Sequence, residues 1–205
     1  MSIVSYNNRS ISSITAIPGT AKSLTHIKTL TASSDSTLSF VNGSSDVVLD
    51  STYPIYIFKF INIHPASDNS TFEVGFRDGS TDYDATKTTT FFWAYHDEAD
   101  SETSLGYLAS RDLAQGTGFT DLSGSVGNGS DESCSGELTL FNPSSTTFVK
   151  HFLSRSSLYE GSSYAMDVHT GGYCNVTAAI DAVQFKFSSG NVDAGTIKLY
   201  GLKDS

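Results

Sequence analysis

The amino-acid sequence predicts an all-β protein, a jelly-roll-like antiparallel β-sandwich of about ten strands. The first observation is an alternation near the C-terminus, where Val183, Phe185 and Phe187 are separated by polar residues and would share one face of a strand. The second is a loop rich in glycine and asparagine that separates this segment from a similar one around Ile197 and Leu199. The third is that such segments recur along the chain, whereas no long segment shows a 3.6-residue period.

The predicted strands follow an N-terminal segment that lacks their pattern. Residues 1–23 contain serine, threonine and asparagine with isolated isoleucines, and we expect them to form an attachment arm. Arms of this composition fray unless a partner surface holds them. Residues 24–205 are expected to form one β-sandwich domain, since a single sandwich accommodates this length.

Nearly all of the expected strands lie outside one long central region. Residues 96–135 are rich in glycine and acidic residues and show no strong strand signal, so they are predicted to form a long loop. Long loops in compact domains usually serve function or interaction. Strands are expected at 27–31, 37–41, 53–63, 71–77, 88–96, 137–141, 146–154 and 164–169, followed by the C-terminal pair within 179–202.

Two predicted strands carry more apolar surface than one core face requires. In 53–63, isoleucines occupy the positions that would face one side of the strand and aromatic residues those that would face the other. Segment 88–96 also has bulky side chains on both sides. A strand that is apolar on both faces is covered on both faces. We therefore expect a partner surface, and the candidate contacts are Ile3, Ile11, Ile14 and Ile17 in the arm and Tyr56, Phe58, Phe60, Trp93 and Tyr95 in the domain.

Composition and charge restrict the class of partner. Acidic residues number 22 against 12 lysines and arginines, which gives a net charge of -10. This balance argues against nucleic acid, because phosphate binding needs clustered Lys and Arg, and against anionic lipid surfaces. The N-terminus lacks the basic and apolar regions of a signal peptide, and no apolar run approaches the roughly 20 residues of a membrane span.

No motif in the sequence points to catalysis, a cofactor or a metal. The histidines lack metal-binding spacing, and there is no nucleophile elbow or phosphate-binding turn. Acidic residues at 78–84 and 97–102 could supply oxygen ligands for calcium, but neither segment matches an EF-hand, and a solvated polar loop is the favoured interpretation. Glutamates such as Glu73 and Glu137 do not identify a glycosidase, because the sequence does not place two of them across a cleft. We therefore assign no catalytic, cofactor or metal residue and expect no enzyme.

Two further features leave alternatives open. Exposed aromatic residues can stack on sugar rings, although packing in a core or interface is the favoured interpretation for the candidates Trp93, Tyr95, Tyr107 and Tyr173. Cys134 and Cys174 are the only cysteines, and idle buried thiols are favoured over a disulfide between them.

Several stretches together resemble one known group of proteins. They are LTASS at 30–34, SFVNG at 39–43, FINIHPA at 60–66, LFNPSSTTFVKHF at 140–152, SSGN at 188–191 and the closing GTIKLYG at 195–201. They resemble small virion structural proteins of tailed bacteriophages that infect marine and freshwater bacteria, especially cyanobacteria. The resemblance covers most of residues 24–202 and excludes the arm. It implies a place in a virus particle and carries over no catalytic motif.

The resemblance and the surplus apolar surface lead to one expected function and two alternatives. We expect an external head decoration (cement) protein, made in the host bacterial cytoplasm, that stabilises a phage capsid through contacts with the major capsid protein or other virion subunits. A homo-oligomer is expected, and a trimer would suit a junction between capsomers. The first alternative is a receptor-binding module of a tail fibre or spike that contacts host glycan. The second, a glycosidase, would release reducing sugar from host polysaccharide.

Overall fold

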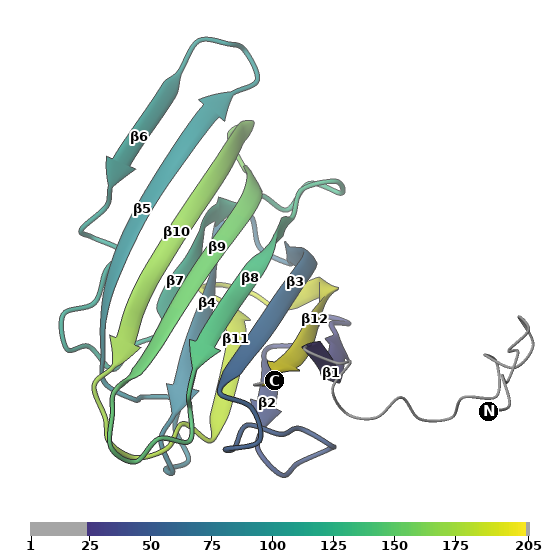
Figure 1. Cartoon of the computed structure of the whole chain (residues 1–205). Helices are drawn as coiled ribbons and strands as arrows, with labels where there is room; N and C mark the ends of the chain where they lie inside the picture. Colours follow the sequence, from purple (N-terminus) through teal and green to yellow (C-terminus); the bar gives the residue numbers. More distant parts are fainter. Residues whose placement is uncertain (1–23, 204–205) are drawn as a thin grey trace, which may run out of the picture.

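The computed structural model describes residues 24–203, which form strands and their connections (Figure 1). Within this range there is no helix long and apolar enough to cross a membrane. The strands are β1 (Leu24–Thr31), β2 (Leu38–Val41), β3 (Ile55–Pro65), β4 (Ser70–Arg77), β5 (Lys87–Asp97), β6 (Thr103–Tyr107), β7 (Thr120–Val126), β8 (Cys134–Phe141), β9 (Lys150–Glu160), β10 (Tyr164–Cys174), β11 (Ala182–Phe187) and β12 (Val192–Leu202).

Eight of these strands have jelly-roll connectivity. The order β1-β12-β3-β8 forms one sheet and β2-β11-β4-β7 the other, with antiparallel pairing throughout. Counted along the chain, these are the first, eighth, third and sixth strands facing the second, seventh, fourth and fifth. This is the double Greek-key order of a jelly roll. The predicted all-β, jelly-roll-like sandwich is confirmed.

The other four strands are two insertions that widen one sheet. β5 and β6 lie between β4 and β7 in the chain, and β9 and β10 lie between β8 and β11. They continue the first sheet in the order β8-β9-β10-β5-β6, so that this "large sheet" has eight strands against four in the "small sheet". In Figure 1, β5, β6 and the adjoining end of β10 reach beyond the small sheet.

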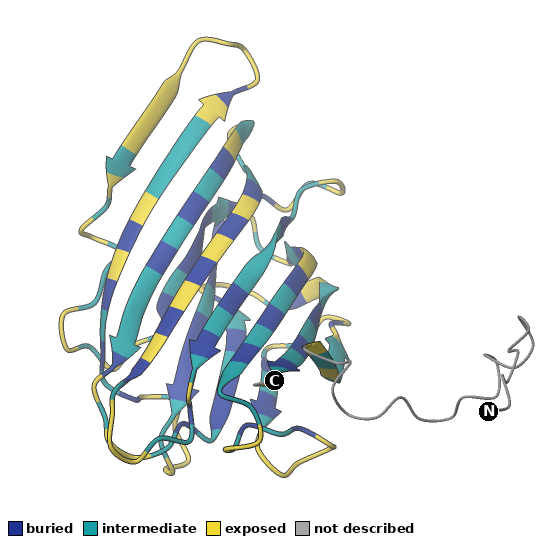
Figure 2. Cartoon of the chain, viewed as in Figure 1, coloured by how far each residue is buried: buried dark blue, intermediate teal, exposed yellow. Residues whose placement is uncertain are grey.

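The core lies between the two sheets and is dominated by phenylalanine. Phe72 of β4 stacks on Phe185 of β11 with ring centroids 5.7 Å apart, and Phe185 also contacts Phe58 and Phe60 of β3 at 5.4 and 5.3 Å. All four side chains are buried. The alternating positions predicted to face inward on 71–77 and 183–187 do so, because period two places every second side chain on the covered face (Figure 2).

The predicted loop at 96–135 is wrong in part, because it contains β6 and β7. β7 directs Thr120, Leu122, Gly124 and Val126 inward, so two of these four inward positions are not large apolar residues and the apolar alternation is absent from the sequence. β6 is a short edge strand whose residues are mostly exposed, so it has no buried face to mark it.

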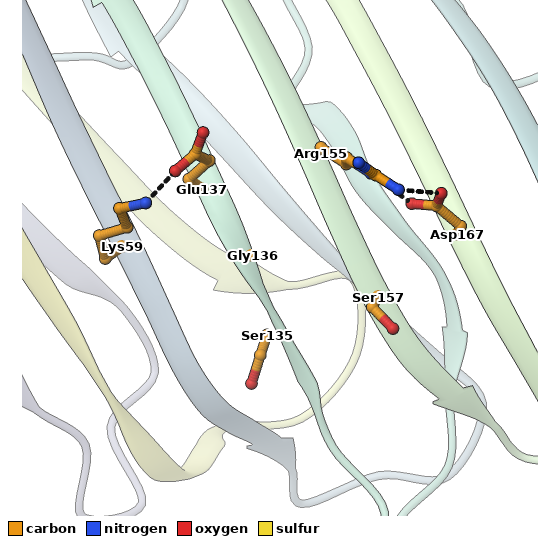
Figure 3. A pocket seen from close by; sticks show the side chains of 7 residues that line it. All are labelled: Lys59, Ser135, Gly136, Glu137, Arg155, Ser157 and Asp167. Atoms are coloured by element: carbon orange, nitrogen blue, oxygen red, sulfur yellow. Dashed lines mark hydrogen bonds and ion pairs between the residues drawn. The ribbon is translucent and has the colours of Figure 1, made fainter.

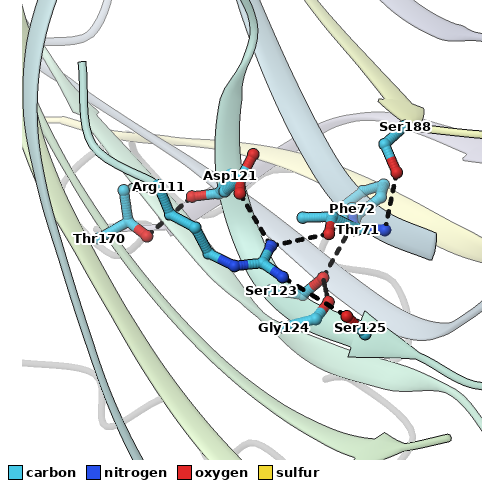
Figure 4. A network of polar contacts seen from close by, with 9 residues as sticks. All are labelled: Thr71, Phe72, Arg111, Asp121, Ser123, Gly124, Ser125, Thr170 and Ser188. Atoms are coloured by element: carbon cyan, nitrogen blue, oxygen red, sulfur yellow. Dashed lines mark hydrogen bonds and ion pairs between the residues drawn. The ribbon is translucent and has the colours of Figure 1, made fainter. Parts of the chain in front are cut away.

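We call the four inserted strands β9, β10, β5 and β6 the extension of the large sheet. A polar network joins the segment that follows β6 to the jelly roll (Figure 4). Arg111, which follows β6, donates from Nη1 to Asp121 Oδ2 on β7 at 2.9 Å and to Thr71 Oγ1 on β4 at 2.8 Å. Thr170 of β10 donates to the main-chain oxygen of Asp121 at 2.8 Å. The Arg111 bonds fix the segment between β6 and β7 to the small sheet, and the Thr170 bond joins β10 of the large sheet to β7 of the small sheet.

Candidate functional site: the outer face of the large sheet

The large sheet has one face on the core and one face towards solvent. The alternation is clearest on β9, where Phe152 and Leu158 are buried while Leu153, Arg155 and Ser157 are exposed. We call the solvent side of the eight strands the outer face; the exposed and half-buried residues of these strands appear as yellow and teal bands in Figure 2. Strand register determines which of these side chains are neighbours. We call the side chains at paired or diagonally adjacent positions on successive strands a row.

One row across the outer face consists of paired charges (Figure 3). Arg155 of β9 donates to both carboxylate oxygens of Asp167 on β10, at 3.0 and 2.8 Å. Lys59 of β3 pairs with Glu137 of β8. The hydrogen bonds from Arg155 hold the pKa of Asp167 below its ordinary value. Together with Ser135, Gly136 and Ser157, the two pairs line a shallow, polar depression of about 520 Å³.

The charged row continues into an aromatic contact on the extension. His169 of β10 stacks on Phe92 of β5 with ring centroids 4.9 Å apart and planes 3° from parallel. His169 Nε2 also lies 3.5 Å from Asp167 Oδ2. Phe92 is 41% exposed even in this arrangement. The row therefore continues from the charged pair on β9 and β10 to the exposed ring of Phe92 on β5.

Beside the charged row, the outer face is apolar and grooved. Leu153 of β9 is 59% exposed, and its cross-strand neighbour on β10 is Gly171. Because Gly171 has no side chain, this part of the outer face forms a groove of about 490 Å³. Its walls are mostly apolar side chains and threonines, and they include Thr88, Thr90, Phe141, His151 and Tyr173. This part of the outer face can accept an apolar side chain from another molecule without moving the backbone.

Three of the predicted contact residues are in the core, and the prediction for them is corrected. Tyr56, Phe58 and Phe60 of β3 are 0%, 0% and 2% exposed and face the small sheet. The other parity of β3, which carries Ile55 and Ile57, lies on the outer face. The larger aromatic side chains fill the space between two sheets, and the isoleucines are left on the less covered side.

The other predicted contact residues have different outcomes. Ile3, Ile11, Ile14 and Ile17 lie outside the described residues. Trp93 and Tyr95 are half-buried on the inner side of β5, beyond the small sheet, while Tyr107 and Tyr173 lie on the outer face. Leu153, Phe92 and Gly171 did not emerge from the sequence, because pairing between β9, β10 and β5 is what brings them together.

The acidic groups and thiols singled out in the sequence form neither a metal site nor a disulfide among the described residues. Between residues 24 and 203 no group of three or more His, Cys, Asp or Glu side chains is arranged to hold a metal ion. Glu73 and Asp121 are cross-strand neighbours whose pKa values are raised by burial, and each is paired with a cation. Cys134 and Cys174 are separate, buried thiols rather than a disulfide.

The architecture places the chain among jelly-roll β-sandwiches, here with a four-stranded extension of one sheet. No family model, curated protein or solved structure matches the chain. Its own surfaces are therefore the basis for assigning a function.

Proposed function

We propose that this chain is a structural protein of a tailed bacteriophage particle, an external head decoration protein that acts through contacts made by the outer face of the large sheet. The observation that carries the proposal is the uncovered apolar groove around Leu153, which lies directly beside a row of paired charges. A sheet face of this kind fits a role in which one subunit lies against another.

The physical role of each part of the outer face is distinct. Burial of the groove against a neighbouring subunit contributes about 25 cal/mol for each Å² of apolar surface removed from water. One copy contributes modestly, and many copies on a shell add their contributions. The pairs Lys59–Glu137 and Arg155–Asp167 add little affinity at an exposed site, but they favour one orientation of the partner.

The sequence resemblance supports the same proposal, and the fold agrees with it. The stretches that resemble phage virion proteins include 140–152, which supplies part of the groove through Phe141 and His151. The jelly roll is also an architecture that viral capsid proteins use, as do lectins, so the fold agrees with the proposal without selecting it.

Electron microscopy of the particle that carries this protein tests the location. Many copies distributed over the head are expected. A few copies at the tail would favour the alternative, a receptor-binding module, and absence from the particle would overturn both.

A binding experiment tests the surface. Leu153→Asp places a charge in the groove and is expected to abolish binding to undecorated heads, while the protein stays folded because the side chain is already 59% exposed. Ser44→Asp adds the same charge at an exposed turn before β3 and serves as the matched control. Equal binding by the two variants would show that the outer face is not the contact surface.

A further inference from the structure

A second candidate site lies on the opposite side of the same sheet, where β5 and β10 extend past the small sheet. Trp93 and Tyr95 of β5 and Tyr164 of β10 are half-buried there. Nearer the small sheet the inward residues of the same strands, Phe91 and Val168, are almost completely buried. The three aromatic residues line an open cavity of about 150 Å³, together with Glu160 and Met166.

The three rings form a continuous strip. The rings of Trp93 and Tyr95 have centroids 4.8 Å apart and planes inclined at 37°. Tyr95 and Tyr164 follow at 5.1 Å and 71°. Because neighbouring rings touch, no ring-sized gap remains between them, and a ligand lies along the strip instead of entering a box of rings.

One carboxylate holds two of the three rings, those of Tyr95 and Tyr164, in place. The Tyr95 hydroxyl donates to Glu102 Oε1 at 2.8 Å, and the Tyr164 hydroxyl donates to Glu102 Oε2 at 3.1 Å. These bonds raise the pKa of both phenols. Glu102 is itself held by the turn after β5, since Asp97 Oδ1 accepts from the main-chain nitrogens of Ser101 and Glu102, both at 2.8 Å. A site whose rings are fixed before binding loses less entropy when a ligand arrives.

We propose that this aromatic strip binds a neutral saccharide. The C–H face of a pyranose packs on the faces of aromatic rings, and Glu160 is placed to accept hydrogen bonds from sugar hydroxyls at the cavity wall. Because the strip crosses two strands, an oligosaccharide matches its length better than a single sugar does. The net charge of -10 disfavours acidic saccharides. Organic cations bind best inside a cage of aromatic rings. These three rings pack against one another and do not enclose such a space.

This proposal does not depend on the proposed function. The strip lies on the inner side of the extension and the groove on the outer face, so either site can fail its test while the other stands. A decoration protein with a saccharide site would present it at the free end of the extension.

The chain offers a direct probe, because Trp93 is its only tryptophan. We would titrate the full chain with linear hexasaccharides of glucose, mannose, galactose and N-acetylglucosamine and follow tryptophan fluorescence. At least one is expected to give a saturable change. Tyr164→Ala should weaken that binding about tenfold, which corresponds to about 1.4 kcal/mol. Glu160→Gln should weaken it less, since the amide retains one acceptor oxygen.

Two control variants test whether the strip itself binds the saccharide. Phe92→Ala removes an exposed ring from the outer face of the same strand and should leave the affinity unchanged. Tyr95→Phe retains the ring but loses the bond to Glu102, and its effect should be smaller than that of Tyr164→Ala. No response to any of the saccharides, a response only to tetramethylammonium, or full affinity in a folded Tyr164→Ala variant would each overturn the proposal.

Discussion

Arg111 Nη1 donates a hydrogen bond to Asp121 Oδ2 over 2.9 Å and so ties the segment after β6 to β7. Burial raises the pKa of Asp121, and the neighbouring guanidinium opposes that effect. The side chains are 25% and 19% exposed, which makes the pair more protected than the ion pairs of the outer face. The segment after β6 is therefore held by an ion pair, whereas phenylalanine side chains dominate the packing between the two sheets.

Replacing Arg111 with methionine should destabilise the protein by about 1–3 kcal/mol at about pH 7, because Asp121 is left charged and without its partner. The loss of stability caused by Arg111→Met should be smaller at about pH 4. Without the guanidinium the pKa of Asp121 rises further, so a larger fraction of the carboxyl is neutral at the lower pH and fewer molecules contain an unpaired buried charge. Urea unfolding at both pH values measures the difference.

The control for this change is Arg155→Met on the outer face. Arg155 is 67% exposed and its bonds to Asp167 lie in water, so the cost should stay below about 1 kcal/mol. Equal losses for the two variants would contradict the structural role given to Arg111.

Gly136 is expected to tolerate no side chain. A Cβ at this position of β8 would lie 2.8 Å from the Ser156 Cα on β9 and still closer to the Arg155 carbonyl oxygen, and both are main-chain atoms. Gly136→Ala should therefore cost about 1–3 kcal/mol as the two strands move apart. Thermal and urea unfolding provide the measurement.

Gly118→Ala is the matched control for Gly136→Ala. A Cβ at Gly118 meets no atom within 4 Å, and the residue is exposed. Its stability should stay within about 0.5 kcal/mol of the unchanged protein. If Gly136→Ala is equally well tolerated, the close approach of β8 and β9 is not required for the fold.

The buried thiols should make stability fall in alkaline solution. Burial raises the pKa of Cys134 and Cys174 to about 12, from an ordinary value of 9.0. Between these values the unfolded chain loses thiol protons that the folded chain keeps, so raising the pH favours unfolding. Each thiol contributes at most about 1.4 kcal/mol per pH unit. Comparing Cys134→Ala with the unchanged protein between about pH 8 and pH 10 isolates one thiol, and the variant should show the shallower decline.

Deletion of residues 1–23 should leave the fold intact. Among the described residues, the buried core begins at Ala32 and the first strand at Leu24. We expect an unchanged melting temperature together with loss of binding to phage heads. Cosedimentation with heads measures the binding, and undiminished binding would show that the arm is not the anchor.

Predictions from the sequence succeeded where one strand carried its own pattern. Phe72, Val74 and Phe76 were expected on one buried face of 71–77, and they are buried there. The predictions failed where the burial of a residue depends on side chains from other strands. β7 has Thr120 and Gly124 at inward positions, and the Met166 side chain already occupies the space that a Gly124 Cβ would need. Of the candidate contacts, Trp93 and Tyr95 are accessible, whereas Tyr56 is buried and donates its hydroxyl hydrogen to the Asp50 carbonyl.

By itself, the sequence determined that this protein is built of strands and which residues of a strand share a face, because period two is a local property of extended backbone. Only the tertiary structure decided which face of β3 meets the core, that β5, β6, β9 and β10 widen one sheet, and that Leu153 lies beside Gly171. Those outcomes depend on pairing between segments that lie far apart in the chain, and no local pattern specifies such pairing.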